Sequence, residues 1–285
     1  MGPVRPSSAR VKRGRHDAER IELPNDLNAL FPYIMKGRND SIAYYPITIE
    51  VDNLLEYIER KAGTDEAITF FQAILLALTK ILRQRPWLNR YIIGRRLYQR
   101  HDVVLGFIAR RALTEDSHET NVLVRIQPED SRRQAIDKIT GRIREAKAGS
   151  AKADDKVISA LMRLPRSLLR VVVKLLELWD FYVDTPSFLR GVDPLHCSAY
   201  LANVGSVGLG APYHHLFEWG TCSLFITIGR IEPKVCVGPD GQPTVRRAVD
   251  LKIALDERIA DGFYDARSLE LFTQYLSHPE LLEEL

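Results

Sequence analysis

An apolar stretch over residues 161–183 constrains the fold of this chain most, because it is long enough to cross a lipid bilayer. Charged residues nevertheless recur through it every three or four positions, at Arg163, Arg166, Arg170, Lys174, Glu177 and Asp180. In an α-helix this spacing places them along one stripe, and each charge at bilayer depth would be costly. The pattern therefore predicts a long amphipathic helix that packs on a core or a neighbouring subunit, with no membrane partner. Pro186 and Pro194 then break the chain.

Composition narrows the class of protein further. The chain has 285 residues, of which 45% are hydrophobic and 27% charged, so it lacks the strong bias of disordered, collagenous or disulfide-scaffold proteins. Its formal charge of +3 is too small over this length to indicate nucleic-acid binding by itself. The length suffices for one large domain or two modest ones.

The basic excess is concentrated near the N-terminus. Six cations there meet only Asp17 and Glu19; they are Arg5, Arg10, Lys12, Arg13, Arg15 and Arg20. We expect a basic flexible arm over residues 1–27, followed by one domain over residues 28–285. A solvated tail is favoured over an arm that binds nucleic acid or a membrane surface, because no aromatic residues interleave the charges. No apolar segment follows the cations, which argues against a signal peptide.

The cysteines and histidines indicate neither a disulfide framework nor a metal site. Cys197, Cys222 and Cys236 are odd in number and form no C-x-x-C pair, which suits reduced thiols in a cytoplasmic protein. His196 and Cys197 lack a compact ligand motif with the later histidines, so we expect no metal.

Strand and helix periodicities alternate along the rest of the chain. Period-two patterns predict strands at residues 45–51, 103–110, 120–126, 195–204, 223–231 and, across a GPDGQ turn, 235–237 and 244–255. Helical spacing predicts helices at residues 52–60, 69–85, 129–146 and 265–277. The predicted class is mixed α/β, with strands clustered toward the C-terminal half.

Four segments carry a resemblance to a known family. They are ITIEVDNLL (47–55), RPWLN (85–89), YLANVGSVG (200–208) and LKIALDERIADGFYDAR (251–267), with ITIGRIEPKV (226–235) before the last. Their order and spacing resemble the catalytic core of 2-oxo acid dehydrogenase acyltransferases, which is similar in fold to chloramphenicol acetyltransferase. The resemblance covers residue 44 to the C-terminus and implies a sandwich of a mixed sheet with flanking helices that forms trimers. No lipoyl or subunit-binding domain fits before residue 28 of this sequence.

The resemblance implies a general base at a specific position. In that family a His-x-x-x-Asp-Gly motif supplies the histidine that removes the acceptor proton during acyl transfer from coenzyme A. Here the motif contains Glu257 at the histidine position, whereas Asp261 and Gly262 match. The family's aspartate orients the site through ion pairing, so the structural part of the motif is present.

The second catalytic element of the family is a hydroxyl that binds the tetrahedral oxyanion. Aligning YLANVG with the family's TISNLG-like run places Ala202 at that position, and alanine has no donor. Loss of an oxyanion donor costs roughly 2.7 to 4 kcal/mol, and loss of a general base costs about 10²- to 10⁴-fold in rate. Glu257 and Ala202 thus stand at the positions of both usual catalytic residues of the family.

Three side chains are candidate substitutes for the base. A glutamate in water has a pKa of about 4.3, roughly four units below that of a thiol, so Glu257 would need burial to serve; an ion pair that holds a loop is the favoured interpretation. His214 and His215 are adjacent, and in an extended chain at most one of them would face a pocket. A solvated or hydrogen-bonded histidine pair is favoured over a replacement base.

Two functions stay open. The first is a homotrimeric binding or assembly module that holds acyl-CoA or an acyl acceptor in the channel between subunits without transferring the acyl group. The second is an active coenzyme A-dependent acyltransferase that uses Glu257, helped by His214 or His215. We expect no covalently bound cofactor, and the basic arm as a nucleic-acid tether is the weakest hypothesis. Two carboxylates, Glu283 and Glu284, interrupt the apolar C-terminus, which predicts a trimer that does not assemble into a cage.

Overall fold

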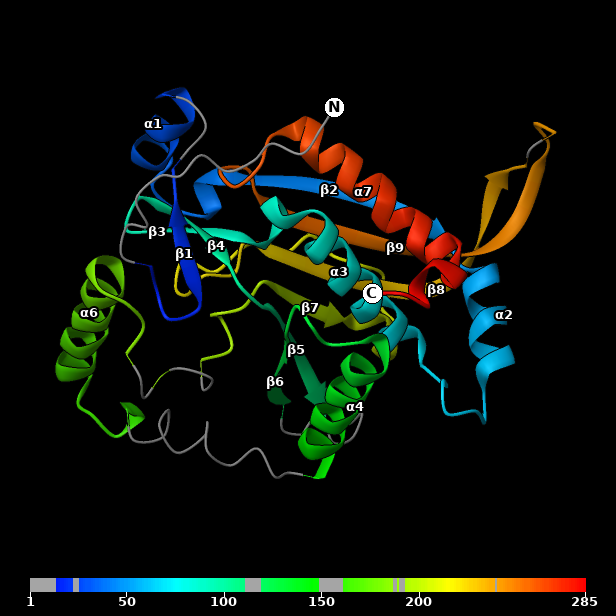
Figure 1. The fold of residues 1–285 in the computed structure, drawn as a ribbon, viewed down its shortest axis with the longest axis horizontal. Coiled ribbons are helices and arrows are strands. Elements are labelled where there is room, and N and C mark those ends of the chain that lie inside the picture. The colour runs from blue at the N-terminus through cyan, green and yellow to red at the C-terminus, as the bar shows by residue number, and fades with distance from the viewer. Residues whose placement is uncertain are drawn as a thin grey trace.

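A mixed sheet of six strands runs through the computed structural model, which describes residues 14–22, 26–110, 119–148, 161–186, 189, 193–238 and 240–285 (Figure 1). The strands lie in the order β2, β9, β8, β7, β5, β6. Their bounds are β2 Ile42–Glu50, β5 Val103–Arg110, β6 Glu119–Ile126, β7 Ala199–Asn203, β8 Leu224–Val237 and β9 Pro243–Asp256. β7 is parallel to both β5 and β8, and the other neighbours are antiparallel. The mixed α/β class is thus confirmed.

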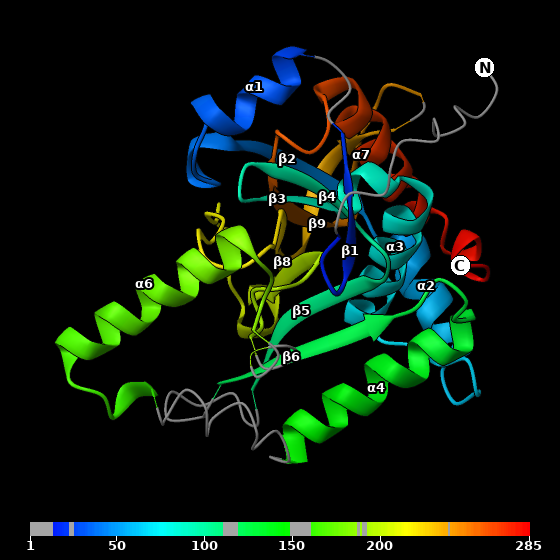
Figure 2. The same cartoon turned by 60° about the vertical axis from the view of Figure 1, so that its left-hand side comes forward.

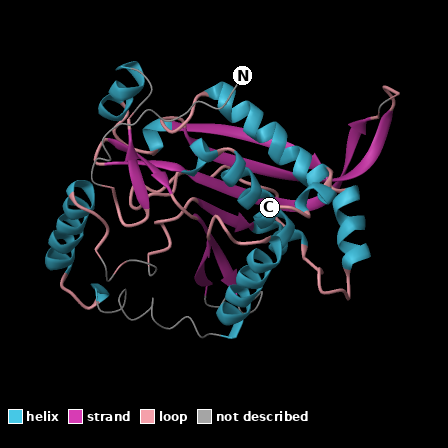
Figure 3. Cartoon of the chain, viewed as in Figure 1, coloured by secondary structure: helices cyan, strands magenta, loops and turns pink. Residues whose placement is uncertain are grey.

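Helices cover one face of this sheet and form the main hydrophobic core with it (Figure 3). They are α2 (Asp52–Lys61), α3 (Phe70–Gln84), α4 (Arg132–Ala148) and α7 (Gly262–Ser277). The most deeply buried of them is α3, whose central residues from Gln72 to Leu82 are all buried. A capping box begins α3, because Thr69 accepts from the backbone of Gln72 while the Gln72 side chain accepts from the backbone of Thr69.

The opposite face of the sheet has a smaller core. Val104, Tyr200, Phe225 and Ala254 point to this side, and Leu216 packs over them from the segment that precedes β8. Short 3₁₀ helices complete the chain: η1 (Asn39–Ser41), η2 (Pro86–Asn89), η3 (Val204–Val207) and η4 (Pro279–Leu282). The candidate site residue Ala202 belongs to this second face.

A second, three-stranded sheet includes part of the expected N-terminal arm. Its order is β1 (Ala18–Ile21), β4 (Arg96–Arg100) and β3 (Arg90–Ile93). Ala18 is almost fully buried, and Asp17 is buried beside Arg100 and accepts a hydrogen bond from Tyr91 Oη. Residues 14–22 therefore differ from the flexible arm that the sequence indicated, because buried charge pairing and strand pairing fix them. Residues 1–13 lie outside the described residues.

Two features project from the main body. The far ends of β8 and β9 extend beyond the other strands as a two-stranded arm (Figure 1), on which Val235, Val237 and Val245 are exposed. Helix α6 (Arg166–Tyr182) lies at the other end of the molecule and stands out from it (Figure 2). None of the described helices is long and apolar enough to cross a membrane.

The predicted amphipathic helix over residues 161–183 is confirmed as α6, but it is not packed into a core. Asp180 is its one fully buried residue, whereas Leu168, Leu175 and Trp179 are exposed. The sequence pattern predicts an apolar face on this helix, but it does not specify which part of the protein, or which partner, covers that face.

The expected clustering of strands toward the C-terminal half is wrong. β1, β3 and β4 were not predicted, and six of the strands precede α4. These three have four or five residues each, too few for a period-two pattern to stand out. α1 (Asp26–Ile34) was also not predicted.

Candidate functional site

Glu257 lies immediately after β9 and is exposed to solvent in the single chain. Its neighbours fix this position. Arg258 donates to both carboxylate oxygens of Asp256, at 2.8 and 2.7 Å, and both side chains are buried. Arg258 also donates to the carbonyl of Met35, and the Glu257 backbone nitrogen donates to the carbonyl of Ser41. The turn is therefore held by the flanking ion pair, and the Glu257 side chain is open to solvent beside it.

Asp261 and Gly262 form the start of α7. Asp261 is the N-cap residue, and its carboxylate accepts from the backbone nitrogen of Tyr264 at 2.8 Å. It is exposed, and the ion pair at this turn joins Asp256 and Arg258 instead. A Cβ on Gly262 would meet no atom within 4 Å in the described chain.

One turn further along α7, Asp265 is the most perturbed carboxyl of this region. It is 1% exposed, and Tyr45 Oη donates to its Oδ2 at 3.2 Å, while Oδ1 has no hydrogen-bond partner among the described residues. Burial, with the nearby charges of Asp261 and Glu257, raises the pKa of Asp265 to about 6. Burial and the same Asp265 raise the pKa of Tyr45 to about 12. Sequence reasoning missed Asp265, although its i+4 spacing from Asp261 places it on the same side of the helix.

Ala202 lies in β7 with its side chain on the second face of the sheet. It is paired with Thr227 of β8, which in turn is paired with Lys252 of β9. Thr227 is 1% exposed, and its hydroxyl donates to the carbonyl of Pro212 at 2.5 Å. The hydroxyl beside Ala202 is therefore already engaged.

Ala202 and Glu257 are far apart within one chain. Through Thr227, Ala202 lies in register with Lys252, two strands away on β9. Glu257 comes five residues after Lys252, just past the end of β9. At about 3.3 Å per residue and 4.8 Å per strand, the separation is on the order of 20 Å. Only a second copy of the chain could bring a Glu257 to Ala202.

His214 and His215 lie side by side in the loop before β8, so the expectation that they point to opposite faces is wrong. Their rings stack with centroids 4.7 Å apart, and the His214 ring also stacks on Phe225 at 3.9 Å. The segment is not an extended strand, so the period-two argument did not apply. Nδ1 of His214 contacts the His215 carbonyl at 2.7 Å, and Nδ1 of His215 contacts the Leu216 carbonyl at 2.8 Å.

These contacts define the tautomer of both rings. A carbonyl oxygen only accepts, so each Nδ1 must be the protonated nitrogen. In the neutral ring Nε2 then keeps its lone pair. Because Phe225 lies two residues before Thr227 on the same face, His214 and Ala202 share one face of the sheet.

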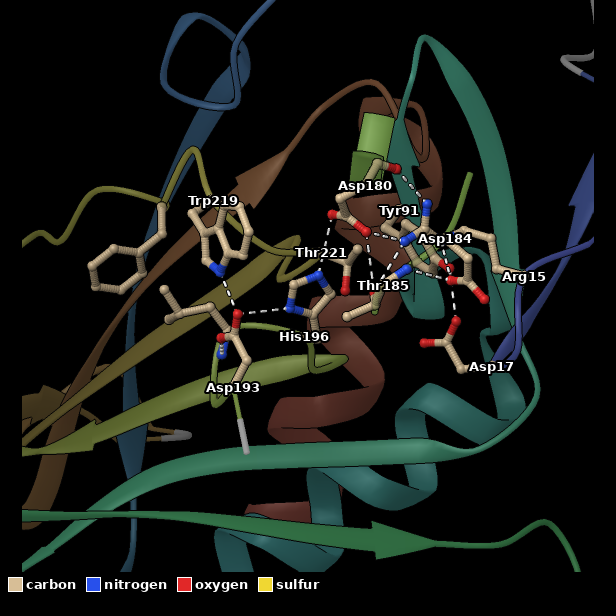
Figure 4. Close-up of polar contacts among 12 residues, drawn as sticks. Arg15, Asp17, Tyr91, Asp180, Asp184, Thr185, Asp193, His196, Trp219 and Thr221 are labelled. Carbon is tan, nitrogen blue, oxygen red and sulfur yellow. Dashed lines mark hydrogen bonds and ion pairs between the residues drawn. The ribbon is translucent and has the colours of Figure 1, made fainter. Parts of the chain in front are cut away.

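A buried charged network, which sequence reasoning also missed, is centred on His196 and shares a cavity with Arg258 (Figure 4). His196 is placed between two carboxylates, with Nε2 3.3 Å from Asp180 and Nδ1 3.1 Å from Asp193. Burial alone would lower the pKa of His196, but the two carboxylates raise it. Trp219 donates to Asp193, and Arg15 pairs with Asp180. The network joins the end of α6 to the N-terminal segment and to the loops that precede β7 and β8.

Cavities adjoin both sides of this network. One of about 440 Å³ is lined by His16, Thr185, His196 and residues of β6 and α4, and another of about 360 Å³ by Lys36, Asp180, Trp219 and Arg258. Among the described residues, no group of three or more His, Cys, Asp and Glu side chains is placed to hold a metal ion.

Solved structures identify the architecture. The chain aligns with the cubic core of the pyruvate dehydrogenase multienzyme complex at a TM-score of 0.59 and 11% identity, covering 99% of both chains. It aligns with a dihydrolipoamide acetyltransferase from Azotobacter vinelandii at 0.58 and 13% identity, again over 99% of both. A probable dihydrolipoamide acetyltransferase from Listeria monocytogenes gives 0.56 and 15% identity over 90% of this chain and 94% of the other. This chain has the acyltransferase-core fold.

No protein-family model matches the sequence, and no curated protein is significantly similar to it. The acyltransferase-core fold is thus shared at identities of 11 to 15%. The Azotobacter structure concerns the roles of a serine, a histidine and an asparagine in that protein's catalytic mechanism. In the fold of this chain, Ala202 is the last residue but one of the short parallel strand, and Glu257 begins the turn between the last strand and the last long helix.

Proposed function

We propose that this protein is a homotrimeric binding module of the acyltransferase-core fold, which holds acyl-CoA or an acyl acceptor without the usual transfer chemistry. One observation carries the proposal: the methyl group of Ala202 stands beside a threonine hydroxyl that already donates to the Pro212 carbonyl. An oxyanion formed there would meet no free hydroxyl from this part of the sheet. The absent donor alone corresponds to roughly 2.7 to 4 kcal/mol of transition-state stabilisation.

The position of Glu257 supports the same function. Its carboxylate is exposed in the single chain, and the buried pair of Asp256 and Arg258 beside it needs no help to hold the turn. A carboxylate in water is a weak base toward a thiol, because the pKa values differ by roughly four units. Glu257 therefore suits recognition of a ligand better than proton transfer.

The separation of the two positions and the arm of β8 and β9 support the proposed trimer. A site that includes both Ala202 and Glu257 requires two copies of the chain. The arm exposes Val235, Val237 and Val245, and a lone two-stranded ribbon is marginally stable in water. We therefore assign these valines to the contact between subunits.

The C-terminus fits a trimer without a cage. Leu282 is fully buried in its own chain, and the Lys80 ammonium donates to the carbonyls of Leu281 and Glu284 at 2.6 Å. The end of the chain is thus held against α3 of the same molecule and is not free to dock elsewhere.

A second candidate function rests on His214. Its Nδ1 proton is fixed by a carbonyl, so Nε2 is the basic nitrogen, and the ring lies on the same face of the sheet as Ala202. This arrangement suits a general base in an active acyltransferase. A backbone amide would then have to serve the oxyanion.

Calorimetric titration with acetyl-CoA and a thiol-release assay on the same trimer distinguish the two functions. The binding module should bind the ligand and release coenzyme A no faster than the uncatalysed background. Ala202→Ser combined with Glu257→His should then create measurable turnover, with the single variants as matched controls.

The active acyltransferase would instead show turnover in the unaltered protein, abolished by His214→Gln and retained by His215→Gln. That result would replace the binding module by the enzyme. Absence of both ligand binding and turnover would overturn both functions.

A further inference from the structure

We propose that α6 docks the protein onto the surface of an anionic lipid bilayer, in contrast to the absence of a membrane partner that the sequence pattern predicted. Five apolar residues of α6 follow one another in alternating steps of three and four, and this spacing places them on one face of the helix. They are Leu168, Val171, Leu175, Leu178 and Tyr182, and Trp179 lies beside them. We call these six residues the apolar stripe.

The apolar stripe is open to solvent. Leu175 is 60% exposed, Trp179 54% and Tyr182 62%, and no described residue covers them. An exposed apolar patch of this kind, on a single helix that stands out from the body, marks an interaction surface (Figure 2). Its tryptophan and tyrosine near one end are the residues enriched at the boundary between lipid and water.

The charged residues around the apolar stripe indicate what kind of partner it binds. Arg163, Arg166, Arg170 and Lys174 are all exposed and occupy the first part of the helix and the turn before it. The one exposed carboxylate of the helix, Glu177, is already paired with Lys174 at 2.7 Å. Asp180 is turned into the protein. A helix with an apolar face and a basic polar face is the pattern of segments that lie in the surface of an anionic membrane.

A second copy of the same helix fits less well. Side-by-side α6 helices would cover both apolar stripes, but they would leave the cations of each helix offset only by its own Glu177. Anionic headgroups, in contrast, complement the cations while the acyl chains receive the leucines.

The neighbouring helix α1 adds to the same surface chemistry. It lies at the same end of the molecule as α6 (Figure 1), and its Leu27, Leu30 and Ile34 are exposed with the spacing of one helical face. Lys36 and Arg95 line the cavity that α1 and α6 share. Apolar and cationic groups are thus gathered at one end of the molecule.

The charged network described above holds α6 in place for this role. Asp180, in the last turn of α6, pairs with the buried Arg15 and the largely buried His196 (Figure 4). The helix is therefore anchored at its C-terminal end by charges that point inward. The apolar stripe is displayed by a fixed helix, and binding does not have to order it first.

The test is vesicle flotation of the full-length protein. We expect it to float with vesicles of phosphatidylcholine and phosphatidylserine, to float poorly with phosphatidylcholine alone, and to release as salt rises. The Arg166→Glu/Arg170→Glu variant should lose at least roughly 25-fold in partitioning, since each lost cation accounts for about fivefold and each added carboxylate is repelled by the same anionic surface. The Leu175→Glu/Trp179→Glu variant should lose about tenfold or more.

Matched controls separate α6 from charge and hydrophobicity in general. Arg133→Glu/Arg144→Glu makes the same charge change on the exposed face of α4, and Leu281→Glu replaces an exposed leucine of η4. Both should float like the unaltered protein, and circular dichroism checks that every variant is folded. In addition, lipid with brominated chains should quench the fluorescence of Trp179, a signal that Trp179→Phe removes.

Three outcomes would overturn the proposal. They are no flotation with anionic vesicles, flotation that the α6 variants leave unchanged, and a smaller oligomer for Leu175→Glu/Trp179→Glu in the absence of any vesicle binding. The last would show that the apolar stripe is an interface between copies of this chain.

Discussion

At the scale of single residues, the environment of a carboxyl decides what it can do. Glu257, Asp261 and Asp265 lie within one short stretch, yet Glu257 is exposed, Asp261 caps a helix and Asp265 is buried with an unpartnered oxygen. The sequence alone does not distinguish these three roles. Burial raises the pKa of Asp265 to about 6.

Asp265→Asn should therefore change how stability depends on pH. The folded-state pKa of about 6 lies above the unfolded value, so the native protein binds the proton more tightly and loses stability as pH rises from about 4 to 6. Asparagine does not ionise, so the variant should gain about 1 to 2 kcal/mol relative to the unaltered protein between pH 4 and pH 7.5. Urea unfolding at both pH values measures this gain. Asp137→Asn, at an exposed position of α4, is the control, and an equal gain there would contradict the prediction.

His196→Ala should destabilise the protein strongly. It removes the cation between Asp180 and Asp193. Asp180 keeps its pair with Arg15, but Asp193 loses its pairing with the histidine, so we expect a loss of about 3 kcal/mol, whereas His101→Ala at the surface should cost little. Because the carboxylates raise the pKa of His196, its contribution is present below the unfolded pKa and is lost as pH rises through the folded value. Thermal unfolding across this range should show the two proteins converging at high pH. Parallel curves would contradict the role assigned to the ion pairs.

At the scale of elements, two helices of similar apolar content differ in how far they are buried. α3 is buried over most of its length between the sheet and the other helices, whereas α6 keeps its apolar stripe in solvent. Helical periodicity predicts both helices equally well. The difference lies in what the chain places against each, and that follows from strand order rather than from the helix itself.

The arm of β8 and β9 belongs to the same scale. Val235→Asp/Val245→Asp places two carboxylates on opposed positions of the ribbon, so it should dissociate the proposed trimer without unfolding the sheet. Light scattering with size-exclusion chromatography should show the mass fall from three chains to one. Ile108→Asp, at an exposed position of β5, is the control, and a trimer that survives the double variant would move the subunit contact elsewhere.

At the scale of the whole molecule, the fold separates the proposed ligand site from the proposed membrane surface. Ala202 and the loop with His214 lie on one face of the central sheet, while α6 stands at one end and the valine-bearing arm at the other (Figures 1 and 2). A trimer formed through the arm would leave α6 free. The protein is then suited to present a bound acyl ligand near a lipid surface.

The sequence by itself determined the elements with strong periodicity and the architecture implied by four ordered segments. α3, α7, β5, β6 and the hairpin of β8 and β9 lie within a few residues of their predicted bounds, because long apolar patterns specify local structure. The sequence did not predict the short strands, the order of residues 14–22, the stacking of His214 on His215 or the His196 network. Those depend on charges and rings brought together from distant parts of the chain, and only tertiary packing sets which of them meet.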